Sequence, residues 1–139
     1  MSYYRFVIAV VVASWAPDAL AQSVAITEIH NNPPGEDSGR EFVELFNYGR
    51  TALDLGGWRL SDRDGDLSIL PAGTQLGACN YLVIVSGGNT NNRTAAQSKA
   101  AFEAEWNAGL PDARVIGVAT GPGAPVSFGN NTDELVLTN

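Results

Sequence analysis

Residues 26–62 read ITEIHNNPPGEDSGREFVELFNYGRTALDLGGWRLSD, and this stretch decides the fold. Residues 24–29 show the period-2 pattern of a β-strand, with Val24 and Ile26 on one face and Ala25, Thr27 and Ile29 on the other. The Pro-Pro-Gly break at 33–35 ends this strand, because proline cannot donate a ladder hydrogen bond. In EFVELFN, at 41–47, valine and leucine alternate with two phenylalanines, so both faces are apolar and we expect a central strand.

The rest of the chain predicts further short strands separated by turns, which is typical of a sandwich. Residues 58–60 and 67–70 flank a turn at 61–66 and predict a hairpin, and the apolar run at 81–85 predicts a strand that is buried on both faces. Two more strands are expected at 115–119 and 134–138.

Between residues 94 and 108 the apolar period becomes helical. Thr94 is the expected cap, and Gly109 with Pro111 supplies the stop. Phe102 and Trp106 fall on one face of this helix, so we interpret it as a lid over the open end of the sandwich. The alternative is that the two aromatic side chains form a ligand platform.

The order and spacing of these features resemble the lamin tail domain family. The resemblance rests on EFVEL followed by Asn47, DLxGWxLxD at 54–62, LPAGTxL at 70–76, YLVIV at 81–85 and DELVL at 133–137, and it covers residues 24–139. It implies an all-β fold, an immunoglobulin-like β-sandwich with one short helical insert. In that family one more strand normally follows a glycine turn, so we expect the C-terminal strand to be missing here.

The N-terminus has the features of a secretory signal peptide, residues 1–21. Arg5 precedes an apolar run at 6–13, and small residues at 19–21 predict cleavage after Ala21. The run is shorter than the roughly 20 residues that span a bilayer, so we expect no membrane span after cleavage. An uncleaved anchor or a buried strand is the alternative. The expected location is secreted, either extracellular or on the cell surface.

Residues 22–139 are about 118 residues, enough for one domain with its own core. The formal net charge is −7, and removal of the signal peptide takes away one basic and one acidic side chain and leaves it unchanged. An acidic surface repels phosphates, which argues against nucleic-acid binding by this module alone. The basic residues are also scattered along the chain: Arg40, Arg50, Arg59, Arg63, Arg93, Lys99 and Arg114.

Cys79 is the only cysteine, so an internal disulfide is excluded. Its apolar surroundings predict a small, partly buried thiol at the entrance to a strand. A nucleophilic role would require a nearby base, and the only histidine is His30. Because nothing in the sequence supplies an orienting third group or an oxyanion site, we interpret His30 as a residue at the end of a strand.

Asp62, Asp64 and Asp66 form the one constellation with metal-ligand character. Carboxylates at alternate positions suit Ca²⁺, which prefers oxygen ligands. The EF-hand pattern fails, because Leu67 and Gly73 occupy the positions that require glycine and glutamate. The favoured interpretation is a hairpin tip, in which aspartate and glycine are preferred, and calcium binding is the alternative.

Two of the three glutamates Glu28, Glu41 and Glu44 could in principle act together as a general acid and base. Strand alternation places Glu28 on the face of Ile26 and Glu44 on the face of Phe42 and Phe46. We expect at least one of the two to be partly buried and to pair with Arg40 or Arg59. We therefore assign no catalytic and no cofactor-binding residues.

The sequence favours a non-catalytic extracellular interaction or adhesion module, not an enzyme, within a larger secreted or surface protein. The expected partner is a protein, a polysaccharide or another copy of the chain, and the sequence does not choose among them. Two alternatives remain. One is a calcium-dependent adhesion domain that uses the three aspartates. The other is an accessory domain of a secreted hydrolase or nuclease, because the resemblance implies modules joined to such enzymes.

Overall fold

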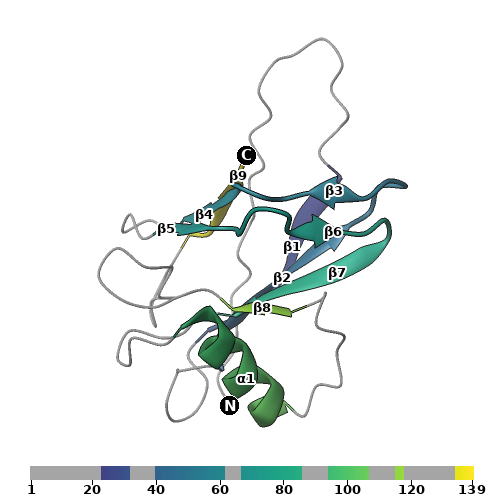
Figure 1. The fold of residues 1–139 in the computed structure, drawn as a ribbon. Coiled ribbons are helices and arrows are strands. Elements are labelled where there is room, and N and C mark those ends of the chain that lie inside the picture. Colours follow the sequence, from purple (N-terminus) through teal and green to yellow (C-terminus); the bar gives the residue numbers. More distant parts are fainter. Residues whose placement is uncertain (1–22, 32–39, 62–66, 86–93, 107–114, 118–133) are drawn as a thin grey trace.

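The computed structural model describes residues 23–31, 40–61, 67–85, 94–106, 115–117 and 134–139. They form mainly β-strands in two packed layers with a helix beside them (Figure 1). In chain order the elements are β1 (Val24–His30), β2 (Phe42–Asn47), β3 (Leu53–Asp54), β4 (Arg59–Ser61), β5 (Leu67–Ile69), β6 (Gln75–Leu76), β7 (Asn80–Val85), α1 (Ala95–Trp106), β8 (Val115–Gly117) and β9 (Val136–Thr138). Within this described part, no helix is long and apolar enough to cross a membrane.

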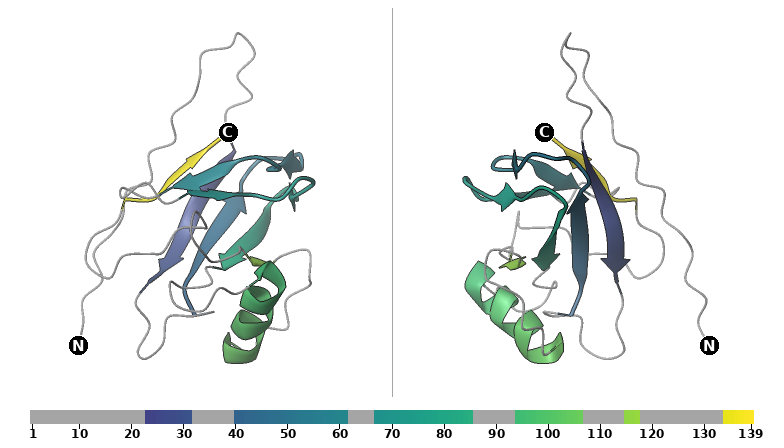
Figure 2. Two further views of the ribbon diagram at one scale, coloured as in Figure 1. Left: turned by 60° about the vertical axis from the view of Figure 1, so that its left-hand side comes forward. Right: turned by 90° about the vertical axis from the view of Figure 1, so that its right-hand side faces the viewer.

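The core lies between the two layers (Figure 2). One layer is a sheet with the order β1-β2-β7-β8, and the other contains the β3-β6 pair and the β5-β4-β9 sheet. Buried aliphatic side chains from both layers fill the space between them: Val24, Val43, Leu45, Leu55, Leu60, Leu70, Leu76, Leu82, Ile84, Leu135 and Leu137. The predicted all-β sandwich with a short helix is confirmed.

Strand β2 is central in its sheet, as the sequence predicts, because it pairs antiparallel with both β1 and β7. Val43 and Leu45 point into the core and are fully buried. Phe42, Glu44 and Phe46 alternate with them and are half-buried on the opposite side. We call this opposite side of the β1-β2-β7-β8 sheet the outer face.

A β-bulge in β1 overturns part of the predicted alternation. The pairing register with β2 shifts between Ile26 and Glu28, so Thr27 is an extra residue in the strand. As a result Ile29 packs against the core together with Ile26, and Glu28 lies exposed opposite Glu44. The expectation that Ile29 and Ile26 lie on opposite faces, and that Glu28 shares the face of Ile26, is wrong.

The second layer contains the predicted hairpin. Strands β4 and β5 are antiparallel, with Arg59 opposite Ile69, and β9 pairs with the other edge of β4. Strands β8 and β9 lie within the two C-terminal segments that were predicted as strands, although residues 118–119 fall outside the described residues.

Helix α1 begins with a reciprocal cap, which confirms Thr94 in that role. The Gln97 amide donates to the Thr94 hydroxyl over 3.2 Å, and the Thr94 amide donates to the Gln97 side-chain oxygen over 2.8 Å. Two amides at the helix start, which have no partner within the helix, are thereby satisfied.

The helix connects β7 to β8, which are parallel, and it packs on the outer face of their sheet. Phe102 is 4% exposed and contacts the cluster formed by Val83, Val85 and Val115, with Phe42 packed against it. The predicted lid over the open end of the sandwich is therefore wrong in position. The helix instead covers one part of the outer face, and no other described element covers the rest.

A buried asparagine joins the end of β2 to the neighbouring turns. The side chain of Asn47 is fully buried, and its amide makes hydrogen bonds at both the nitrogen and the oxygen. The nitrogen donates to the backbone oxygens of Thr51 (2.8 Å), Leu76 (3.1 Å) and Gly77 (3.1 Å), and the oxygen accepts from the Gly49 amide (2.8 Å) and the Ser23 hydroxyl (3.0 Å). Gly49 is required at this point, because a Cβ there would lie 2.4 Å from the Ser23 hydroxyl oxygen.

We predict that Asn47→Ala lowers the free energy of unfolding by about 2–4 kcal/mol, because several backbone groups lose their partner. Urea denaturation measures the change. Asn139→Ala is the control, since Asn139 is exposed and its replacement should change stability by less than about 0.5 kcal/mol. Equal midpoints for Asn47→Ala and the unmodified protein would contradict this account.

Candidate binding surface

The predicted metal ligands Asp62, Asp64 and Asp66 lie outside the described residues, so their arrangement stays a prediction. Among the residues that the structure does describe, no group of three or more His, Cys, Asp or Glu side chains is placed to hold a metal ion.

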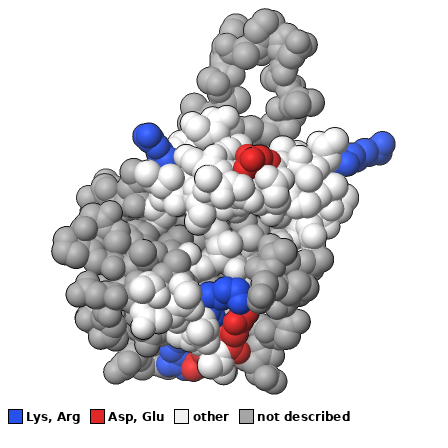
Figure 3. Space-filling model, in the orientation of Figure 1, with Lys and Arg blue, Asp and Glu red and all other residues white. Residues whose placement is uncertain are grey.

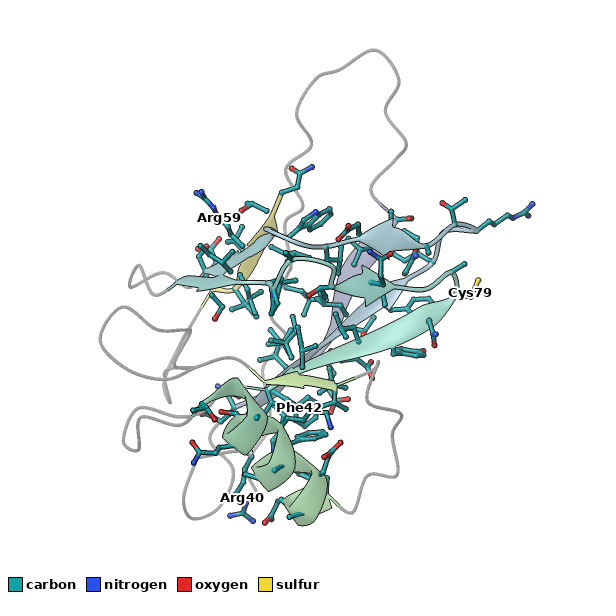
Figure 4. The ribbon with its side chains drawn as sticks, viewed as in Figure 1. Arg40, Phe42, Arg59 and Cys79 are labelled. Carbon is teal, nitrogen blue, oxygen red and sulfur yellow. The ribbon has the colours of Figure 1, made fainter. Side chains whose placement is uncertain are left out.

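His30 and Cys79 lie at opposite ends of the same sheet, so they form no catalytic pair. His30 is opposite Phe42 in β2, whereas Cys79 immediately precedes Asn80, which is opposite Asn47. The two ends of β2 are roughly 17 Å apart, at about 3.4 Å for each residue of a strand. Figure 4 shows Cys79 at the far end of the sheet from Phe42.

The environment of Cys79 also differs from the prediction. It does stand at the entrance to a strand, β7, but its thiol is exposed and not partly buried. Its φ of 51° places the backbone in the left-handed region, in a tight turn that leads into the strand. Leu76 and Leu82 are buried in the core, whereas Ala78 and Tyr81, which lie closer to the cysteine, are exposed as it is.

Glu28 and Glu44 lie opposite each other in the β1-β2 register, whereas Glu41 directly precedes β2. Glu41 is buried, Glu28 is exposed, and Glu44 accepts a hydrogen bond of 2.7 Å from the Thr27 hydroxyl. Arg40 forms its ion pair with Glu105 of α1.

The expected partner Arg59 is exposed on β4, in the other layer, where Figure 4 shows it well away from the outer face. The predicted pairing of Glu28 or Glu44 with Arg40 or Arg59 is therefore wrong. The bulge is the physical reason, because it turns Glu28 toward the solvent and brings the Thr27 hydroxyl to Glu44.

Aromatic side chains gather on the part of the outer face that α1 leaves uncovered. The ring of Phe46 lies 4.5 Å from that of Tyr81 and 6.4 Å from that of Tyr48, measured between centroids. Tyr48 is 55% exposed and Tyr81 is 43% exposed. The sequence predicted that residues 81–85 form a strand buried on both faces. Residues 82–85 are buried as predicted, but Tyr81 is exposed.

A second aromatic group stands at the other end of the outer face. The His30 ring stacks on Phe42 at 5.3 Å and meets the edge of Trp106 at 5.1 Å. Trp106 is 42% exposed, whereas Phe102 on the same helix belongs to the core. Of the two helix aromatics, Phe102 is thus a core residue and Trp106 contributes to the surface.

Charged residues of the described part are dispersed over the face of the molecule that Figure 3 shows. Figure 3 shows Lys and Arg side chains at separate places on one side of the molecule, with acidic side chains between some of them. The described part of this side has no continuous basic patch, which a nucleic-acid surface would require.

The two packed layers and the buried aliphatic core define an immunoglobulin-like β-sandwich domain. Residues 17–139 match the Lamin Tail Domain family, and the chain belongs to this family. The comparison with curated proteins gives no significant match. The domains of this family are non-catalytic immunoglobulin-like modules.

We predict that the exposed and buried aromatic residues differ in their effect on stability. Phe102→Ala should lower the free energy of unfolding by about 3–5 kcal/mol, because it leaves a cavity between the helix and the sheet. Tyr81→Ala should cost about 1 kcal/mol or less, since much of that ring is already in water. Chemical denaturation of both variants measures the difference, and comparable losses would show that the uncovered aromatic group is part of the core.

Proposed function

We propose that this chain is a secreted, non-catalytic interaction module that binds a partner through the uncovered part of its outer face. The observation that carries this proposal is the group of Phe46, Tyr48 and Tyr81. Partly exposed aromatic rings, held in position by a rigid sheet, are typical of binding surfaces. A rigid sheet also reduces the entropy that a partner must overcome on binding.

Secretion is supported by the N-terminal sequence. Residues 1–21 combine a basic start, a short apolar run and small residues at the predicted cleavage position. The protein that reaches the partner would therefore begin at Gln22 and carry a net charge of −7, as the full chain does. The family assignment supports a module that recognises a partner and does not turn over a substrate.

The test compares the retention of the domain on immobilised extracellular proteins and on insoluble polysaccharides. The protein is expressed with its full N-terminus and collected from the medium, where we expect a product that begins at Gln22. We predict that Tyr48→Ser combined with Tyr81→Ser reduces retention at least about tenfold, because each loses an exposed ring.

The matched control is Ile69→Ser. Ile69 is 57% exposed on β5, in the other layer, so its replacement removes a similarly exposed apolar side chain away from the outer face. Unchanged retention of the double tyrosine variant, or an equal loss with Ile69→Ser, would contradict the proposed surface.

A second candidate, calcium-dependent adhesion, is favoured by the alternation of Asp62, Asp64 and Asp66 alone. If the aspartates bind Ca²⁺, calorimetric titration should release heat, and the thermal midpoint should rise at millimolar metal. Both effects should disappear in Asp64→Asn. An absence of heat and of a thermal shift in the unmodified protein would reject this candidate.

A further inference from the structure

The outer face carries a row in which an acidic pair lies between two aromatic groups. Along β2 the row runs from Phe46 through Glu44 to Phe42, and these residues are opposite Ala25, Glu28 and His30 of β1. Residues two apart on one face of a strand are separated by about 7 Å. Tyr81 extends one aromatic end of the row and Trp106 extends the other. We call this set the outer-face row.

The acidic pair is arranged unfavourably for the isolated domain. Glu28 and Glu44 are directly opposite each other in the β1-β2 register, and like charges in such positions repel. Thr27 donates to one oxygen of the Glu44 carboxylate, which holds that side chain on the outer face. Within the described residues neither carboxylate has a Lys or Arg partner, because the ion pairs there are Arg40–Glu105 and Lys99–Glu103.

A cation that contacts both carboxylates would relieve this repulsion, and the flanking rings limit what kind of cation fits. A planar guanidinium can pair with two carboxylate oxygens and stack on an aromatic face at the same time. An ammonium group is a more strongly hydrated point charge and gains less from stacking. A neutral polysaccharide would use the rings and leave the two carboxylates unpaired.

We propose that the outer-face row binds an arginine-bearing, extended segment of a partner protein. This inference rests on the proposed function, because it names the partner of the same face. The guanidinium lies between Glu28 and Glu44, and the stem of the arginine or a second arginine packs on Phe46 and Tyr81. The net charge of −7 favours the approach of a basic segment over an acidic one.

The test uses three fluorescein-labelled heptapeptides in which glycine alternates with arginine, lysine or glutamine. This spacing places successive side chains of one face about 7 Å apart in an extended peptide, as in the row. We expect the arginine peptide to bind more tightly than the lysine peptide in fluorescence anisotropy at low salt. The glutamine peptide should not bind, and binding should weaken as salt screens the charges.

Two variants test the acidic pair. Glu28→Gln and Glu44→Gln should each weaken binding of the arginine peptide about tenfold, because each removes one carboxylate of the pair. The control is Glu134→Gln, which removes the same charge at an exposed position before β9, in the other layer. Circular dichroism and thermal midpoints confirm that all three variants fold as the unmodified domain does.

The outcomes separate this inference from the proposed function. Equal binding of the arginine and glutamine peptides, or equal loss with Glu134→Gln, would overturn the arginine-bearing partner. If retention on a protein or polysaccharide depends on Tyr48 and Tyr81 but is unchanged by Glu28→Gln and Glu44→Gln, the proposed function stands and the arginine segment is rejected. If none of the outer-face variants alters any binding, both proposals fail.

Discussion

The buried amide of Asn47 is the contact on which the arrangement of the sandwich depends. Its nitrogen and oxygen satisfy backbone groups of two segments, one that directly follows β2 (Gly49 and Thr51) and one much further along the chain (Leu76 and Gly77). Because buried carbonyls and amides must find partners, one side chain sets where these turns meet. Gly49 fits beside it only because it has no side chain. The position of β6 relative to the central strand follows from this contact.

The two faces of the β1-β2 pair have different roles. The bulge at Thr27 in β1 places Ile29 toward the core and Glu28 on the outer face. The inner face contributes aliphatic side chains to the core, and the outer face contributes rings and a carboxylate. Helix α1 then covers one end of the outer face through Phe102 and leaves the other end in contact with water. The candidate binding surface is therefore the part of the outer face that does not belong to the smaller hydrophobic cluster beneath α1.

Local signals in the sequence predicted the central strand, the hairpin and the Thr94 cap, because each depends on residues close to one another in the chain. The errors arose where a single inserted residue or a distant contact decided the outcome. The bulge at Thr27 reversed the faces of Glu28 and Ile29, and strict alternation contains no signal for it. The site of helix docking and the parallel pairing of β8 depend on long-range packing. The exposure of Tyr81 on the candidate binding surface was missed, because the sequence grouped Tyr81 with the buried residues that follow it.

The bulge also affects how the sheet meets other molecules at its edge. Among the strands that the structure describes, β1 is at the edge of the β1-β2-β7-β8 sheet, and the backbone groups at a sheet edge can pair with another chain. A bulge interrupts the regular spacing of those groups, and the exposed charge of Glu28 next to it repels a second acidic copy. Thr27, the extra residue of the bulge, thus determines which side chains of β1 face the core and also disfavours edge-to-edge aggregation of the domain.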